Sequence, residues 1–199
     1  MGRGKKIVDK GIVLEAALGI IENEGLEQFS TRRLAAALGI SAMTLYNYYD
    51  NREAILREVA LRGLSDFFER YEAEAKALGS EGGSPLRVFK ALAMEFLRFG
   101  RERPLLYLFL FDSSLAEIRH DPQVARYFTH TFNEVVGRIR DQAALPALRA
   151  DITLFQVLAN GLVINFIRGR TKLDESRFKA YIERAYERLL EHHEGELLP

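Results

Sequence analysis

The chain has 199 residues, of which 48% are hydrophobic and 28% are charged, values that exclude a disordered, collagen-like or fibrous protein. Its 28 Lys and Arg residues balance 28 Asp and Glu residues, so a uniformly basic nucleic-acid-binding coat is excluded and any basic contact surface must be local. The absence of cysteine excludes disulfides, thiol nucleophiles and cysteine-ligated metal centres, and it favours the interior of a cell.

Two helices are predicted near the start of the chain. Apolar residues recur at helical spacing over 13–21, and Gly25 is a natural stop just beyond them. Ser30 is an N-cap residue for a short second helix, and Gly39 permits a tight turn after it.

A third and a fourth helix follow this turn. Ser41 caps a short helix over 42–49 that is too rich in polar and aromatic groups to serve packing alone. Asp50 and Asn51 close it and cap a long helix over about 52–77, which ends at the flexible run GSEGGSP. Two short helices joined by a glycine turn predict a helix-turn-helix whose second helix can enter the major groove of DNA.

Further helices are predicted over the rest of the chain. Pro85, Pro104 and Pro122 each stand in the first turn of a helix. The apolar run 104–111 fits a buried strand by periodicity as well, and we interpret it as a helix because no partner strand is predicted nearby. Asp151 and Asp174 are N-cap residues for the last two helices, about 152–168 and 175–193, with residues 144–151 as the connector. The sequence thus predicts an all-α chain of about nine helices.

The segment 152–167 is the most apolar long stretch of the chain. It is shorter than the roughly 20 residues that span a bilayer and contains Gln156, Asn160 and Asn165. We therefore expect a buried helix and no membrane contact. The basic start MGRGKKIVDK lacks an apolar signal core, so the mature chain is expected to keep it.

One stretch of the chain carries a specific set of landmarks in a fixed order. They are Leu14, Ala16, Ala17, Gly25, Thr31, Leu34, Ala35, Gly39, Ser41, Thr44, Leu45, Tyr46, Tyr49 and Leu56. With these landmarks, residues 12–56 resemble the amino-terminal domain of the TetR family of transcriptional regulators. The chain has Met43, Tyr48 and Arg52 where the family more often has a small residue or proline, a histidine and a lysine.

The resemblance implies a DNA-binding domain at residues 1–51, with a basic N-terminal arm, and a ligand-binding and dimerisation domain at 52–199. The expected DNA-contacting residues are Lys5, Lys6, Thr31, Arg32, Arg33, Ser41, Met43, Thr44, Tyr46, Asn47, Tyr48 and Arg52. Hydroxyl, phenol and guanidinium groups among them can donate to phosphate and set the register of the domain. Met43, Thr44 and Asn47 are the candidates for reading bases, since methyl groups contact thymine and an amide can bond adenine. Arg32 and Arg33 serve equally well as solvated helix charges, and Tyr49 is expected to pack in the core.

Two sets of residues in the body are candidates for binding. Possible effector-lining residues are Phe67, Tyr71, Phe89, Phe96, Tyr107, Phe111, Phe128, His130, Thr131, Phe132 and Asn160, although aromatic residues at helical spacing are more often core. Possible dimer-interface residues are Phe155, Leu162, Phe166, Phe178, Ile182, Ala185, Tyr186 and Leu189, unless the chain's own helices cover them.

Nothing in the sequence predicts an enzyme, a metal site or a cofactor. The histidines His120, His130, His192 and His193 lack the four-residue spacing of a zinc site on one helix, and no Gly-rich phosphate loop or G-x-S-x-G motif is present. The leading hypothesis is a cytoplasmic homodimeric repressor that binds a near-palindromic DNA operator and responds to a small apolar or aromatic effector. The alternatives are an adaptor protein that has lost DNA recognition and a helical enzyme with a DNA-binding head.

Overall fold

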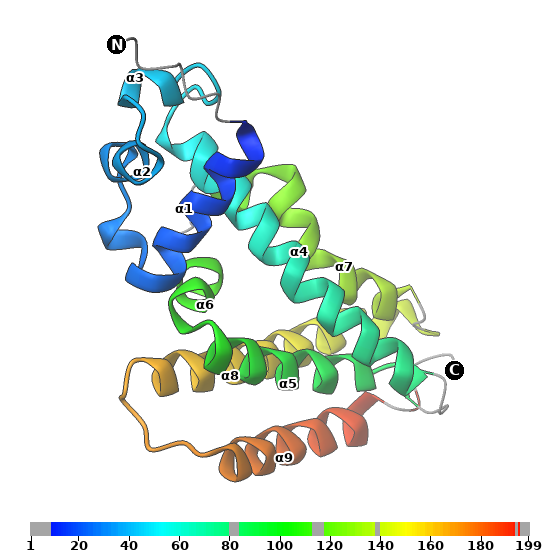
Figure 1. The fold of residues 1–199 in the computed structure, drawn as a ribbon. Coiled ribbons are helices and arrows are strands. Elements are labelled where there is room, and N and C mark those ends of the chain that lie inside the picture. Colours follow the sequence, from blue (N-terminus) through cyan, green and yellow to red (C-terminus); the bar gives the residue numbers. More distant parts are fainter. Residues whose placement is uncertain (1–8, 80–83, 113–117, 138–139, 194, 196–199) are drawn as a thin grey trace, which may run out of the picture. The chain divides into compact units, whose positions relative to one another are not determined.

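The computed structural model describes residues 9–79, 84–112, 118–137, 140–193 and 195 (Figure 1). Over these residues it contains nine α-helices, three short 3-10 helices and no strand. The predicted all-α fold is therefore confirmed. The chain divides into two compact units, one formed by residues up to 64 together with 103–124, the other by 65–102 together with 125–199.

The first unit surrounds a core of apolar helix faces. Its helices are α1 (Lys10–Glu24), α2 (Thr31–Leu38), α3 (Ala42–Leu45), the first part of α4 (Arg52–Gly79) and α6 (Pro104–Phe111). α1 packs against α2 and α6, and Arg103 at the start of α6 forms an ion pair with Glu22 of α1. The core residues Val13, Leu34 and Leu45 have no exposed surface. This packing fixes the positions of the two short helices.

The second unit is built on α5 (Arg87–Glu102), α8 (Leu145–Ile167) and α9 (Glu175–His193), which pack against one another. The remainder of α4 and most of α7 (Pro122–Val136) also belong to it. Phe67 lies against Phe96 and Phe99, with ring centroids 5.3 and 5.4 Å away. The inward faces of these helices thus form a second, aromatic core.

Most of the predicted helix signals are confirmed. Asp174 caps α9 by accepting a hydrogen bond from the Arg177 N–H at 2.8 Å. Asp121 caps α7, accepting from the Gln123 N–H at 2.9 Å. The ambiguous run 104–111 is a helix, as expected when no strand is available to pair with it.

The start of α8 differs from the prediction. α8 begins at Leu145 with Pro146 in its first turn, so residues 144–151 are not a connector and Asp151 lies inside the helix. A 3-10 helix over Gln142–Ala144, capped by Asp141, leads directly into α8, and the proline start signal therefore takes effect before Asp151 can cap. With this extension, Gln142–Ile167 is long and apolar enough to cross a membrane by length and composition, and only 22% of an 18-residue apolar stretch within it is buried. The expected short, buried helix is thus wrong in length and in burial.

Two other boundaries are shifted. α3 ends at Leu45 instead of Tyr49, because the N–H groups of Asn47 and Tyr48 bond three residues back and tighten the chain into a turn. α5 begins at Arg87 instead of Pro85, since the carbonyl of Ser84 accepts the Arg87 N–H and holds a turn there.

Candidate nucleic-acid interface

A tight turn sets the angle between α2 and α3. Gly39 has a φ of 67°, in the left-handed region that favours glycine. Its N–H donates to the Ala36 carbonyl at 3.1 Å, and the Ile40 N–H donates to the Ala35 carbonyl at 3.0 Å. Ser41 then begins α3, accepting from the Thr44 N–H at 3.2 Å, and its hydroxyl lies 2.8 Å from the Thr44 hydroxyl. Ser41 and Thr44 therefore hold the start of α3, where Ser41 is exposed and Thr44 is half-buried.

One side of α3 and the turn after it is exposed. Met43 is 75% exposed and Tyr46 48% exposed, and Asn47 is exposed as well. Leu45, in contrast, is fully buried and anchors α3 to the core. These three side chains, next to a buried anchor, are therefore available for contact with a partner.

Tyr49 anchors the end of this segment. Its hydroxyl donates to Glu58 at 3.2 Å and lies 3.5 Å from the Lys10 carbonyl oxygen. The Lys10 ammonium group lies 5.1 Å from the Tyr49 ring centroid. Burial and the neighbouring Glu58 raise the pKa of Tyr49 to about 12. The expected packing role of Tyr49 is confirmed, with only 4% of the residue exposed.

The basic candidates occupy different environments. Arg33 forms an ion pair with Glu24, which competes with a phosphate for its guanidinium group. Arg52, at the start of α4, lies over the ring of Phe29 at 5.5 Å and is half-buried. Arg32 is exposed on α2. Arg32 and Arg33 are thus both exposed, and they differ in the ion pair that Arg33 makes with Glu24.

The other candidates near the turn are also placed within the first unit. Thr31 is the first residue of α2 and is half-buried, as is Tyr48. Lys5 and Lys6 lie outside the described residues. From Asp9 to Ala60 the sequence has five basic and eight acidic side chains, while residues 1–8 add three basic ones. Residues 9–60 alone thus have a net negative charge, and the three basic residues of the N-terminal arm bring the net charge of residues 1–60 to zero.

The effector candidates do not form one set. Phe67, Tyr71, Phe89 and Phe96 are buried in the second unit, whereas Tyr107 and Phe111 are buried in the first. The rings of Tyr107 and Phe111 are 4.8 Å apart, and burial raises the Tyr107 pKa well above its usual value. All six are buried, which fits the core role that the sequence left open beside the lining role. The remaining candidates are the half-buried Phe128, Phe132 and Asn160, the buried Thr131, and His130, whose side chain lies outside the described residues.

The structure also relocates the face that is available to a partner chain. Five of the dimer candidates are buried within the chain itself, namely Phe155, Phe178, Ile182, Tyr186 and Leu189. Leu162, Phe166 and Ala185 are half-buried. The exposed large apolar residues of α8 and α9 are instead Leu154 (66%), Val157 (64%), Leu158 (40%) and Tyr181 (52%). A groove of about 570 Å³ beside them has Leu158, Leu162, Tyr181 and Ala185 among its lining residues.

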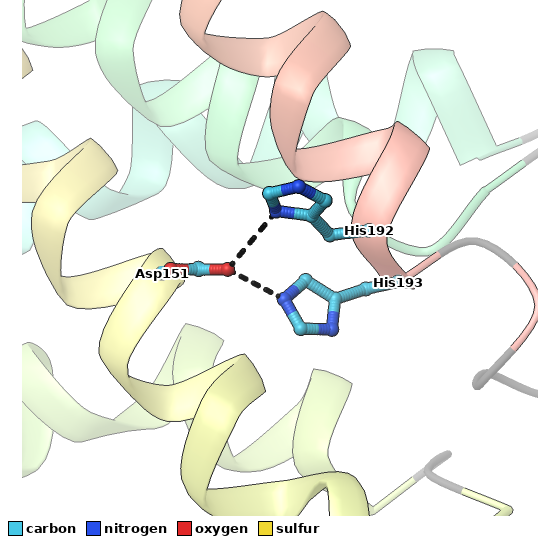
Figure 2. A group of neighbouring side chains, drawn as sticks. All are labelled: Asp151, His192 and His193. Atoms are coloured by element: carbon cyan, nitrogen blue, oxygen red, sulfur yellow. Dashed lines mark hydrogen bonds and ion pairs between the residues drawn. The ribbon is translucent and has the colours of Figure 1, made fainter.

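A further cluster was not predicted from the sequence. Asp151 of α8 meets His192 and His193 at the end of α9 (Figure 2). The hydrogen bond with His193, followed by that with His192, lowers the pKa of the Asp151 carboxyl group. The adjacent histidines could be recognised in the sequence as possible ligands. Their carboxylate partner is distant in the sequence and is brought close by the packing of α8 on α9.

Comparison with known proteins finds a family model that matches the N-terminal region and relatives that match longer parts of the chain. The family model described as "Bacterial regulatory proteins, tetR family" matches residues 13–59. An uncharacterized HTH-type transcriptional regulator, YezE of Bacillus subtilis, is 25% identical over 193 residues, which cover 92% of this chain and 96% of the relative. The HTH-type transcriptional repressor DrrR1 of Streptomyces coeruleorubidus is 36% identical over 94 residues, which cover 47% of this chain and 32% of the relative.

Solved structures match the fold over nearly the whole chain. A transcriptional regulator of Rhodococcus sp. Rha1 superimposes with a TM-score of 0.66 at 16% identity, covering 94% of this chain and 97% of that one. The regulator FadR of Bacillus subtilis, solved in complex with stearoyl-CoA, has a TM-score of 0.59 at 18% identity and covers 89% of this chain and 95% of its own. At these identities the likeness shows a shared fold.

Proposed function

This chain belongs to the TetR family of bacterial transcriptional regulators, and we propose that it represses transcription by binding an operator as a homodimer until a small, mainly apolar effector releases it. Members of this family bind DNA and regulate transcription. The repressor role, the effector and the dimer are our proposals for this chain. We propose no catalytic activity, and we expect the protein to act in the cytoplasm.

The observation that best supports DNA recognition is the exposed side of α3 and of the turn that follows it. Met43, Tyr46 and Asn47 are exposed, whereas Leu45 and Tyr49 on either side of Tyr46 are buried anchors. A helix held in this way can present side chains to base edges without first ordering itself. Asn47 can bond adenine and Met43 can contact a thymine methyl group, while Tyr46 can donate to phosphate.

Selection from a random duplex library tests this function directly. We expect the full chain to enrich a near-palindromic sequence and to bind it with an affinity that falls steeply with salt, because phosphate contacts release counterions. An adaptor protein that has lost DNA recognition enriches no sequence. In that case the exposed side of α3 serves a protein partner.

The proposed dimer rests on the exposed apolar face of α8. Leu154, Val157 and Leu158 lie three and four residues apart, so they share one side of the helix, beside Tyr181 of α9. A second copy of this face would cover it and double the length of DNA read. Because α8 meets the length and composition of a membrane span, flotation with lipid vesicles is the matching control. We expect the protein to remain in the unbound fraction.

The proposed effector is expected to act through the aromatic body. A ligand can weaken operator binding only by its differential affinity for the two states, and typical couplings of about 1–3 kcal/mol change affinity by about 5–150-fold. Mass spectrometry of molecules that copurify with the protein identifies candidates. A true effector must bind more weakly when the operator is present, whereas equal binding with and without operator contradicts this proposal.

A further inference from the structure

We propose that Asp151, His192 and His193 form a binding site for a divalent transition-metal ion of the Zn²⁺ type. Their side chains point toward one another from the facing helices α8 and α9 (Figure 2). His193 Nε2 lies 2.8 Å from Asp151 Oδ2, and His192 Nδ1 lies 3.5 Å from the same oxygen. One ligand atom from each residue lies within 4.8 Å of the other two.

The donor set selects the class of ion. Imidazole nitrogen suits Zn²⁺, Ni²⁺ and Cu²⁺, whereas Mg²⁺ and Ca²⁺ prefer oxygen ligands alone. Zinc bonds of about 2.0–2.2 Å at tetrahedral angles place ligand atoms about 3.4 Å apart. His192 Nδ1 already lies near that distance from Asp151 Oδ2, at 3.5 Å, whereas the His193–Asp151 pair, at 2.8 Å, must open toward about 3.4 Å to admit the ion. Three protein ligands leave a further position for water.

An ordinary ion pair explains only part of this arrangement. One histidine suffices to pair with a carboxylate, yet here two imidazoles approach the same oxygen of Asp151. The His193 side chain is 3% exposed, so one ligand is held rigidly by the protein, while His192 is 66% exposed and leaves the site open to solvent. A buried ligand fixes geometry, and an exposed one gives the ion a path of entry.

Metal binding would join α8 to the last turn of α9. Asp151 lies three residues before Leu154, at one end of the exposed apolar face. The ion would therefore brace the helix pair on which the proposed dimer rests. Metal binding itself is independent of that dimer and of DNA, because all three ligands belong to one chain and one unit.

Zinc titration of the untagged full chain tests the site. The chain has no cysteine to compete for the ion and only four histidines, so bound Zn²⁺ can be assigned to particular residues with few variants. We would measure stoichiometry and affinity with a competing chelator, and thermal unfolding with and without ZnCl₂. The variants are Asp151→Asn and His192→Gln, and His120→Gln is the matched control because His120 is an exposed histidine that belongs to the first unit, whereas the cluster belongs to the second.

We expect the wild-type chain and His120→Gln to bind one Zn²⁺ per chain and to unfold at a higher temperature when it is present. Each ligand variant should bind at least about tenfold more weakly and lose the thermal shift. MgCl₂ should have no effect on either quantity. Absence of Zn²⁺ binding at micromolar concentration, or equal binding by all four proteins, would overturn the proposal. His192→Gln keeps the test valid if Asp151→Asn fails to fold, since the His192 side chain is mostly exposed.

Discussion

In α3 and the turn after it (residues 42–49), some side chains hold the segment against the core of the first unit and others are exposed to a partner. Tyr49 and Leu45 are buried anchors, whereas Met43 and Asn47 are exposed. The family resemblance already predicted that Tyr49 packs in the core. It cannot predict that Arg33 pairs with Glu24, since that contact depends on how α2 meets the end of α1.

Asn47 and Arg52 should affect DNA binding in different ways. Asn47→Ala should relax base preference by about 1–3 kcal/mol if the amide makes a bidentate contact. Arg52→Ala should weaken all sequences alike and make the salt dependence shallower, because it removes a phosphate contact. Titrations of the selected operator and its single-base variants at several salt concentrations measure both effects. Asn23→Ala is the control, since Asn23 is exposed on α1 and bonds only within that helix. Unchanged binding by both variants would contradict the proposal that α3 and the turn after it contact the major groove.

Tyr49 should make the stability of the head depend on alkaline pH. Its folded pKa is raised from 10.0 to about 12, so between these values the unfolded phenol loses its proton first and the unfolded state is favoured. The stabilising contribution is present below pH 10 and is lost as the pH rises toward 12.

Urea unfolding of the wild type and of Tyr49→Phe from pH 9 to 11.5 measures this contribution. At neutral pH the variant should lose about 0.5–1.5 kcal/mol with the hydrogen bond to Glu58. Above pH 10 the difference between the two proteins should shrink. Parallel pH profiles would show that Tyr49 does not titrate in this way.

At the scale of elements, replacing a glycine by alanine within α1 and after α2 should change the free energy of unfolding in opposite directions. Gly39 is in the left-handed region with φ 67°, where an added Cβ costs about 1–2 kcal/mol. Gly19 lies within α1, and an added Cβ would meet no described atom within 4 Å. Gly39→Ala should therefore lower the free energy of unfolding, whereas Gly19→Ala should raise it by about 0.5–1 kcal/mol. Denaturant unfolding followed by circular dichroism compares the two, and a loss of the same size in both would contradict the assigned turn.

Helix starts show why element boundaries were predicted unevenly. At Ser30 and Asp174 the capping side chain bonds the helix N–H groups and the helix began at the expected residue, whereas after Ser84 and Pro85 a turn came first. Before α8 two valid signals competed, Pro146 and Asp151, and the chain used the earlier one. The cluster of Asp151 with His192 and His193 depends on this outcome and on the packing of α9, so no local pattern could have predicted it.

At the scale of the whole molecule, the balance of charge leads us to expect that DNA binding depends on the basic residues of the N-terminal arm. Residues 9–60 have more acidic than basic side chains, and Arg3, Lys5 and Lys6 restore the balance. Replacing Lys5 and Lys6 by glutamine should weaken binding to every sequence. The log–log salt slope should fall by about 0.9 for each phosphate that the arm no longer neutralises. Titration against the selected operator at four salt concentrations measures the slope. An unchanged slope would place the arm away from the duplex.

Assembly is the last property to follow from the fold, and it depends on which apolar residues the chain leaves uncovered. Leu154→Glu and Leu158→Glu place charges on the exposed face of α8, so each should give a folded monomer. A charge at the fully buried Ile182 should instead unfold the chain, and it is not a test of assembly. Thr153→Glu is the control, because Thr153 is exposed on α8 and adjoins Leu154 in the sequence.

Light scattering at micromolar concentration should find dimers of the wild type and of Thr153→Glu, and monomers of the two leucine variants. The monomers should bind the operator weakly, because two heads about 34–36 Å apart are needed to read successive turns of the duplex. Circular dichroism that is unchanged in the monomers separates a failure of assembly from a failure of folding. A wild-type monomer under these conditions would contradict the proposed dimer and leave the apolar face of α8 to a different partner.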